Sequence, residues 1–180
     1  MSLQPTLFSS HESDIGRPRF QETIVPDVAV AVLHNRTTDK VLLIRRSVRA
    51  GFSGWAFPGG KIERPRDANP IDAARRELEE ETGVVMKGGR EIFCRKHPAT
   101  GVLIRYVYFQ VRRHRLNQNA SNQEPEKADE CAWVELEKVD RMFRGGLSRG
   151  LLRGIKRATI SPVKKRDRLA CEPPLLLGDA

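Results

Sequence analysis

Three glutamates on one predicted helix are the side chains of this chain with the clearest capacity for chemistry. Glu77, Glu80 and Glu81 stand at positions i, i+3 and i+4, which lie within one sector of a helix. Carboxylates so placed repel one another and destabilise an unliganded helix. A divalent cation turns that repulsion into coordination, because Mg²⁺ takes oxygen ligands and commonly bridges protein carboxylates to substrate phosphates.

The helix that carries these glutamates has clear boundaries in the sequence. Asn69 suits the N-cap, Pro70 the first helical position and Gly83 the position just after the last turn. An apolar stripe beside the glutamates is expected to dock the helix on a sheet, and it consists of Ile71, Ala74, Leu78 and Val85. Glu79 points roughly the other way. The pattern therefore predicts a helix with carboxylates along one edge.

A glutamate-rich helix standing alone is usually a solvated surface helix. Here it does not stand alone, because Phe57-Pro58-Gly59-Gly60 precedes it and Gly83 follows it. The run Gly60, then Arg76-Glu77-Leu78-x-Glu80-Glu81-x-Gly83-Val84, resembles the Nudix box of hydrolases that act on nucleoside diphosphates linked to another moiety. The loop after Gly60 is two residues longer than in the family pattern, and its nearest acid to the family's first, mainly structural, glutamate is Asp67.

The resemblance implies an α/β fold, the Nudix α/β/α sandwich around a mixed sheet. It also implies a bound Mg²⁺ or Mn²⁺ with Glu77 and Glu81 as principal ligands, Glu80 as the third and the Gly60 carbonyl as a further one. Glu77 and Glu80 thereby become catalytic residues. Arg76 is expected to pair with a box carboxylate and hold the helix against the loop.

The base that activates water comes from the box or from a later loop in the enzymes this chain resembles. Glu126 is the first loop candidate and Glu124 the second, because both lie shortly before Trp133. The alternative is that both are solvated loop acids. A general base typically contributes about 10²–10⁴-fold to the rate, so single substitutions test each.

Substrate contacts are expected from Arg45, Arg46, Phe57 and Lys61. Adjacent strand residues face opposite ways, so only one of the two arginines should reach the ligand. Phe57 could pack on a base, although core packing is the competing interpretation for it and for Trp55.

Several functions fit this resemblance. The run Gly54-Trp55-x-Phe57-Pro58-Gly59-Gly60-Lys61 looks like the MutT branch, which hydrolyses (d)NTPs or related nucleotides. The run Leu42-Leu43-x-x-Arg46-Ser47 faintly resembles coenzyme A diphosphatases. Nucleotide sugars and dinucleotides are further alternative substrates. A function of another class is a non-catalytic nucleotide sensor that binds nucleic acid or protein. Clustered glutamates favour the enzyme, because ligand sensing does not require them.

The elements around the box indicate one domain. Residues 1–22 read as a loose arm, 23–158 as the Nudix domain and 159–180 as an irregular basic, proline-containing tail. Apolar and polar patterns predict strands at 23–33, 41–46, 55–57, 91–95, 102–111 and 131–135, a turn at 34–39 and a basic helix at 146–158.

Composition sets the expected environment and partners. A net charge of +9 and a pI near 9.9 indicate an anionic partner. A solvated basic face on a nucleotide-binding protein is favoured over nucleic-acid binding through the basic tail, because no nucleic-acid-binding motif is present. No apolar run is long enough to span a bilayer and the first residues lack the order of a secretory signal, so a cytoplasmic protein without membrane contact is expected.

Overall fold

The computed structural model describes residues 27–50, 53–111 and 120–160. The predicted arm at 1–22 lies outside the described residues. So does the predicted tail at 159–180 apart from its first two residues, which belong to the last helix. Within the described ranges, no helix is long and apolar enough to cross a membrane.

The described residues form a seven-stranded mixed sheet. Its strands are β1 Val28–Asn35, β2 Lys40–Arg46, β3 Gly54–Ala56, β4 Gly59–Lys61, β5 Arg90–Lys96, β6 Leu103–Val111 and β7 Ala128–Glu135. The main path runs β3-β2-β1-β6-β5, with β4 added to β1 and β7 added to β2. β1 and β6 are parallel, and the other pairs are antiparallel.

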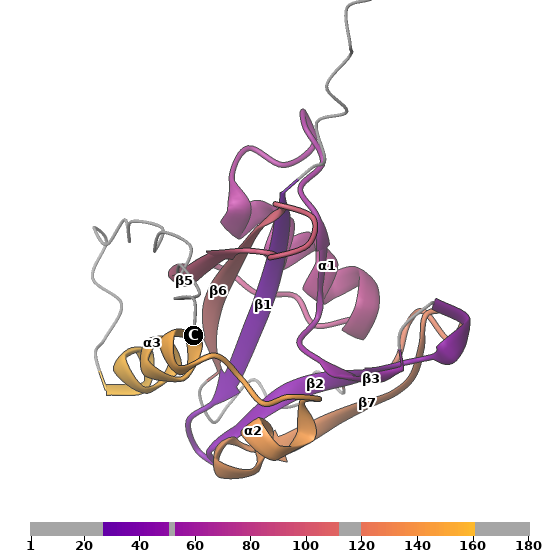
Figure 1. The fold of residues 1–180 in the computed structure, drawn as a ribbon. Helices are drawn as coiled ribbons and strands as arrows, with labels where there is room; N and C mark the ends of the chain where they lie inside the picture. The colour runs from indigo at the N-terminus through magenta and orange to yellow at the C-terminus, as the bar shows by residue number, and fades with distance from the viewer. Residues whose placement is uncertain (1–26, 51–52, 112–119, 161–180) are drawn as a thin grey trace, which may run out of the picture.

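Helices cover both faces of this sheet (Figure 1). The helices are α1 Pro70–Thr82, α2 Val139–Met142 and α3 Arg149–Ile160, with short 3-10 turns at Val48–Ala50 and Leu136–Lys138. α1 packs against one face, whereas α2 and α3 pack against the other. The predicted α/β/α sandwich around a mixed sheet is confirmed.

Strand β1 lies at the centre and is buried on both faces, which explains its continuous apolar run. Successive side chains alternate between the two cores, so Leu33 packs on the α1 side and Val32 on the α3 side. The site helix is thus held by a core layer of its own. Ala73, Ala74 and Leu78 bury its apolar face against that layer.

The ends of α1 are those predicted. The Asn69 side chain accepts hydrogen bonds from the amides of Ile71 and Asp72, and Pro70 opens the helix. Gly83 adopts a left-handed conformation with φ of 71° and its amide donates to the carbonyl of Glu79. These caps fix the phase of the helix and so the direction of its glutamates.

Several predicted boundaries are wrong. His34 and Asn35 extend β1 rather than starting the turn, because His34 is buried and its Nδ1 lies 2.7 Å from the Tyr108 hydroxyl. No strand is predicted after 55–57 until 91–95, yet Gly59–Lys61 forms β4 and pairs with β1. Val85, which is predicted to belong to the apolar stripe that docks the helix on the sheet, is 48% exposed. The neighbouring Val84 is buried instead.

The basic helix also differs in extent from the predicted 146–158. It begins at Arg149, because the Ser148 hydroxyl accepts a hydrogen bond from the Leu151 amide and so ends the preceding loop. It ends at Ile160, so the predicted tail begins inside the helix.

Candidate functional site

The site is built where the glycine turn of β4 meets the edge of α1. β4 pairs with β1 so closely that a Cβ on Gly59 would lie 2.5 Å from the Ala29 carbonyl oxygen. Only glycine fits there. The strand thereby carries its backbone directly under the helix edge that holds Glu77 and Glu81.

Glu81 is the most enclosed of the three glutamates. Its side chain is 6% exposed, and its carboxylate accepts a hydrogen bond from the Gly59 amide at 2.8 Å. The Arg46 guanidinium donates to the other oxygen at 3.3 Å and also to the Gly59 carbonyl at 2.9 Å. Burial raises the pKa of Glu81 to about 7, against the lowering by Arg46 and the Gly59 amide.

Glu77 faces the next glycine of the same turn. A Cβ on Gly60 would stand 2.4 Å from the Glu77 carboxyl carbon, so the Gly60 backbone lies in contact with that carboxylate. Arg76 donates to Glu77 at 2.7 Å. Burial nevertheless raises the pKa of Glu77, because desolvation exceeds the stabilisation by the guanidinium.

Substitution by alanine is expected to lower activity at Gly60 and stability at Gly59. Gly60→Ala should leave the fold nearly as stable as wild type, because its methyl collides with the movable end of the Glu77 side chain, but activity should fall at least about tenfold. Gly59→Ala should destabilise by about 1–3 kcal/mol, because its methyl meets the β1 backbone. Chemical denaturation and turnover assays on both variants would separate the effects. Equal loss of stability in the two would contradict this geometry.

Asp67 takes the structural place of the first glutamate of the family pattern, which this chain lacks because its loop is two residues longer. Its side chain is 2% exposed and receives two hydrogen bonds from Arg76, at 3.1 and 2.9 Å. The Glu63 amide donates to it at 2.8 Å, and its own amide donates back to the Glu63 carbonyl. The hydrogen bond from Arg76 lowers the pKa of Asp67. The two extra residues therefore lengthen the loop without removing its anchor.

Arg76 holds the loop and the helix together. Besides Asp67 it donates to the Lys61 carbonyl at 2.9 Å, to Glu77 and, at 2.9 Å, to Glu80. The hydrogen bond with Asp67 raises its pKa further, so it stays charged. The expected pairing of Arg76 with box carboxylates is thus present.

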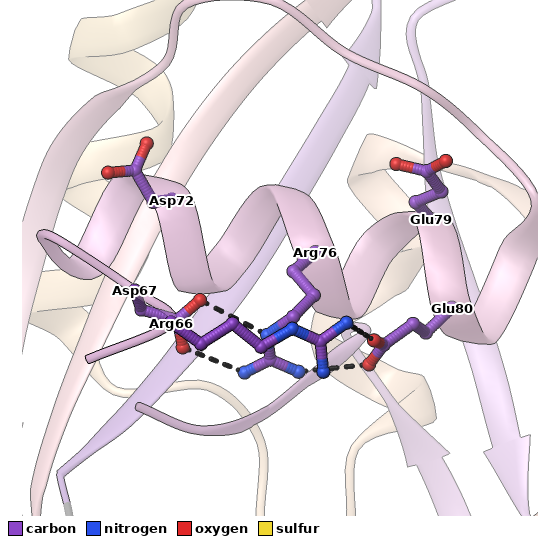
Figure 2. A pocket seen from close by; sticks show the side chains of 6 residues that line it. All are labelled: Arg66, Asp67, Asp72, Arg76, Glu79 and Glu80. Atoms are coloured by element: carbon purple, nitrogen blue, oxygen red, sulfur yellow. Dashed lines mark hydrogen bonds and ion pairs between the residues drawn. The ribbon is translucent and has the colours of Figure 1, made fainter. Parts of the chain in front are cut away.

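Glu80 points away from Glu77 and Glu81 and toward two arginines. Arg66 donates to one of its oxygens at 2.7 Å and Arg76 to the other. Figure 2 shows both guanidinium groups between Asp67 and Glu80, with Asp72 and Glu79 directed away from them. These residues line a surface pocket of about 380 Å³.

The segment at 120–127, which precedes β7, reaches the end of α1. The amides of Ser121 and Gln123 donate to the Thr82 and Glu81 carbonyls at 3.1 Å each, which pins this loop to the helix. Within it, Glu124 is close enough to Glu81 to raise the pKa of that carboxyl. Its Oε1 accepts from Lys127 at 2.6 Å.

Glu126, the first loop candidate, lies elsewhere. It is exposed, and its main-chain carbonyl accepts a hydrogen bond from the Ser47 hydroxyl at 3.3 Å. Among the described residues, Glu124 and not Glu126 has a recorded interaction with a box glutamate. Of the two candidates, Glu124 is therefore the one whose charge acts on the box, and which of them is the base stays a prediction. Sequence spacing could not decide it, because the tight turn at 124–128 sets which acid faces inward.

The four residues predicted to contact the substrate do not all lie at the box. Arg46 faces the box, whereas its neighbour Arg45 turns to Glu130 at 3.5 Å, as strand alternation requires. Lys61 has an exposed side chain beside the glycine turn. Phe57 is a correction: it is 4% exposed and packs against Phe143 with ring centroids 5.1 Å apart, so it belongs to the core.

The donor set fits a hard cation. Glu77 and Glu81 present oxygens beside the Gly59-Gly60 backbone, and both pKa values are raised because desolvation by burial exceeds the stabilisation by Arg76 and Arg46. Within the described residues, no three acidic, His or Cys side chains already converge as a metal cluster. Each glutamate is instead turned to an arginine or an amide. Oxygen donors of this kind match Mg²⁺ or Mn²⁺.

This fold and this arrangement of glycine turn, arginine and helix edge define the Nudix class. The chain belongs to that family, since residues 25–151 match its model, described as the NUDIX domain.

Two relatives in sequence share 31% identity with the chain. One is the ADPR responsive transcriptional repressor NtrR of Acinetobacter baylyi, similar over 110 residues that make up 58% of this chain and 42% of the relative. The other is the m7GpppN-mRNA hydrolase NUDT17 of Danio rerio, similar over 156 residues, 77% of this chain and 51% of the relative. The chain thus spans about half the length of these relatives or less.

Solved structures share the fold. The NUDIX domain of Shewanella oneidensis NrtR in complex with ADP ribose has a TM-score of 0.59 at 20% identity, over 72% of this chain and 85% of that one. A MutT structure from work on Aliivibrio salmonicida and Vibrio cholerae has a TM-score of 0.58 at 16% identity, over 73% and 98%.

Proposed function

We propose that this domain is a metal-dependent pyrophosphohydrolase that cleaves a phosphoanhydride bond of a nucleoside diphosphate linked to another moiety. The observation that carries the proposal is the pair formed by the buried Glu81 and the partly buried Glu77, whose carboxylates face the Gly59-Gly60 backbone with raised pKa values. Such a site gains most from a cation, and the substrate class brings phosphates that a cation can bridge.

Each residue of the site then has a defined task. Glu77, Glu81 and the Gly60 carbonyl would hold Mg²⁺ or Mn²⁺, with Glu80 as the third carboxylate ligand. The bound ion supplies charge neutralisation at the phosphates and a more acidic water. Arg76 keeps the helix and the loop in register through Asp67 and Lys61. Arg46 holds the glycine turn against Glu81 and offers a positive charge beside it.

Glu124 is the proposed general base. Lys127 holds its Oε1, which leaves Oε2 to take the proton as the water oxygen bonds to phosphorus and the phosphoanhydride bond breaks. Glu124→Gln should lower kcat by about 10²–10⁴-fold, whereas Glu126→Gln should keep wild-type turnover. Steady-state kinetics on this matched pair tests the assignment. A large loss of kcat in Glu126→Gln, with normal turnover in Glu124→Gln, would assign the general base to Glu126 instead.

The substrate is proposed to be a (d)NTP or a related nucleotide, on the resemblance of residues 54–61 to the MutT branch. The competing substrates are coenzyme A, nucleotide sugars, dinucleotides and, from the names of the relatives, ADP-ribose and capped RNA. A panel of these compounds with Mg²⁺, scored by release of monophosphate or pyrophosphate, identifies the class. Turnover of none of them would contradict the hydrolase proposal.

A second candidate function is nucleotide sensing without catalysis. It is favoured by the similarity to a transcriptional repressor that responds to ADPR. The same panel distinguishes the two: a sensor binds a nucleotide without metal and releases no product. The three box glutamates support the enzyme, because a sensor has no need of them.

A further inference from the structure

The exposed face of α3 carries a row of cations that the proposed hydrolase reaction does not use. Arg149, Arg153, Lys156 and Arg157 are all exposed, and their spacing of four, three and one residues places them within about 100° of one side of the helix. We call these four residues the α3 basic stripe. At 1.5 Å per residue it extends about 12 Å along the helix axis.

The α3 basic stripe lacks the acidic partners that other arginines of this protein have. The ion pairs recorded within the described residues include none of its four members. By contrast, six arginines elsewhere are each paired with a carboxylate, namely Arg45, Arg46, Arg66, Arg75, Arg76 and Arg105. The sequence of α3 itself contains no Asp or Glu.

Of the four charges only Arg157, in the last turn, complements the helix dipole, and the others do not stabilise the helix. Arg149 occupies the first turn, where the helix dipole disfavours positive charge, and no acidic residue stands there. Arg153 has an arginine four residues away on either side, and such like-charged pairs repel. The charges are therefore best explained by a partner that brings the opposite sign.

The helix that presents these charges is firmly mounted. Leu151, Ile155 and Ala158 are buried in the core on that face of the sheet. A Cβ on Gly154 would lie 2.8 Å from the Ile92 carbonyl oxygen of β5, so the helix approaches the strand as closely as its backbone allows. A rigid row of cations loses little conformational freedom when a rigid partner docks on it.

The stripe is also separate from the candidate hydrolase site. α3 lies on the opposite face of the sheet from α1 (Figure 1). Its charges therefore do not line the pocket of Arg66 and Arg76 or hold a substrate beside Glu77. The partner is a second ligand rather than the nucleotide.

We propose that the α3 basic stripe binds the phosphate backbone of duplex DNA. Each strand of a duplex presents one charge per about 3.4 Å of axis, so the stripe spans about three or four phosphates. Helix α3 contains no Phe, Trp or Tyr, and aromatic side chains are what single strands require for base stacking. Contacts of this kind carry no base specificity.

The test is fluorescence anisotropy of a labelled DNA duplex of about 20 base pairs with the full chain, over about 50–200 mM salt. For wild type, binding should weaken linearly in log–log form as salt rises. In the double variant Arg153→Gln/Lys156→Gln the slope should become shallower by about 1.8, because two phosphate contacts are lost. Nucleotide turnover should match wild type, since both side chains are exposed and remote from the site. The melting temperature should be no lower than that of wild type, because the substitution of Arg153 removes like-charge repulsion from α3.

A charge-matched control separates local contact from net charge. Arg36→Gln/Lys87→Gln removes the same two charges from exposed positions outside α3 and should keep the wild-type slope. A single Arg149→Gln variant should bind more weakly while melting no lower than wild type. Equal slopes in the two double variants, or tighter binding of a single strand of the same length, would overturn the proposal. None of these outcomes depends on the hydrolase reaction.

Discussion

Replacement of Glu81 by glutamine is expected to lower kcat at least about 100-fold while making the metal-free protein more stable at pH 8. The loss of activity follows because a bound cation supplies several kcal/mol of charge stabilisation and Glu81 is proposed to hold it. The gain in stability follows because an ionised carboxylate is removed from a position that is 6% exposed. Turnover with Mg²⁺ and chemical denaturation in chelator measure the two effects.

The pH dependence of this gain has a definite sign. Burial raises the pKa of Glu81 from 4.5 to about 7 in the folded protein. Its contribution to stability is therefore fully present below about pH 4.5 and is lost as pH rises through 7. The free energy of unfolding of wild type should fall relative to that of Glu81→Gln over that window, by on the order of 3 kcal/mol in total. Below it the two proteins should be equally stable.

Glu79→Gln is the matched control, because it makes the same chemical change two residues away on the exposed side of α1. It should keep both wild-type turnover and wild-type pH dependence. If Glu81→Gln and Glu79→Gln behave alike, Glu81 neither holds a cation nor carries a buried charge, and the proposed site is wrong.

The helix of the site could be predicted from local rules. Asn69, Pro70 and Gly83 act through contacts with their immediate neighbours, so their roles are visible in the sequence without the rest of the fold. For Arg45 and Arg46 the sequence goes only part of the way. Alternation requires that one of them face the box, although only the structure shows that it is Arg46.

Features that depend on the meeting of distant segments were harder to predict. Gly59–Lys61 forms strand β4 because it pairs with β1. Glycine has a low strand propensity, so the sequence of this segment alone does not predict a strand. Phe57 is apolar and next to the turn, so only packing against Phe143 assigns it to the core. Glu124 faces the box because the loop is tied to the end of α1 by main-chain hydrogen bonds, which no side-chain pattern reveals.

The substitution Asp67→Asn is expected to cause the largest loss of stability. Asp67 and Arg76 are 2% and 10% exposed, and removal of one partner of a buried pair costs about 3–5 kcal/mol because it leaves an uncompensated charge. Arg76 keeps Glu77, Glu80 and the Lys61 carbonyl as partners, so we expect a loss of about 2–3 kcal/mol, below that range. Denaturant unfolding at neutral pH measures it.

Two comparisons show whether this loss comes from the buried charge pair. Arg66→Gln breaks the pair of the 60% exposed Arg66 with Glu80, and should change stability by less than about 1 kcal/mol. Because Arg76 lowers the pKa of Asp67 below 3.8, the stability that this pair contributes is present above that pH and is lost as pH falls further. The difference between wild type and Asp67→Asn should therefore shrink in acid. A difference that stays constant down to pH values well below 3.8 would mean that the substituted amide disturbs the loop by its shape, and that the charge of Asp67 does not anchor the box.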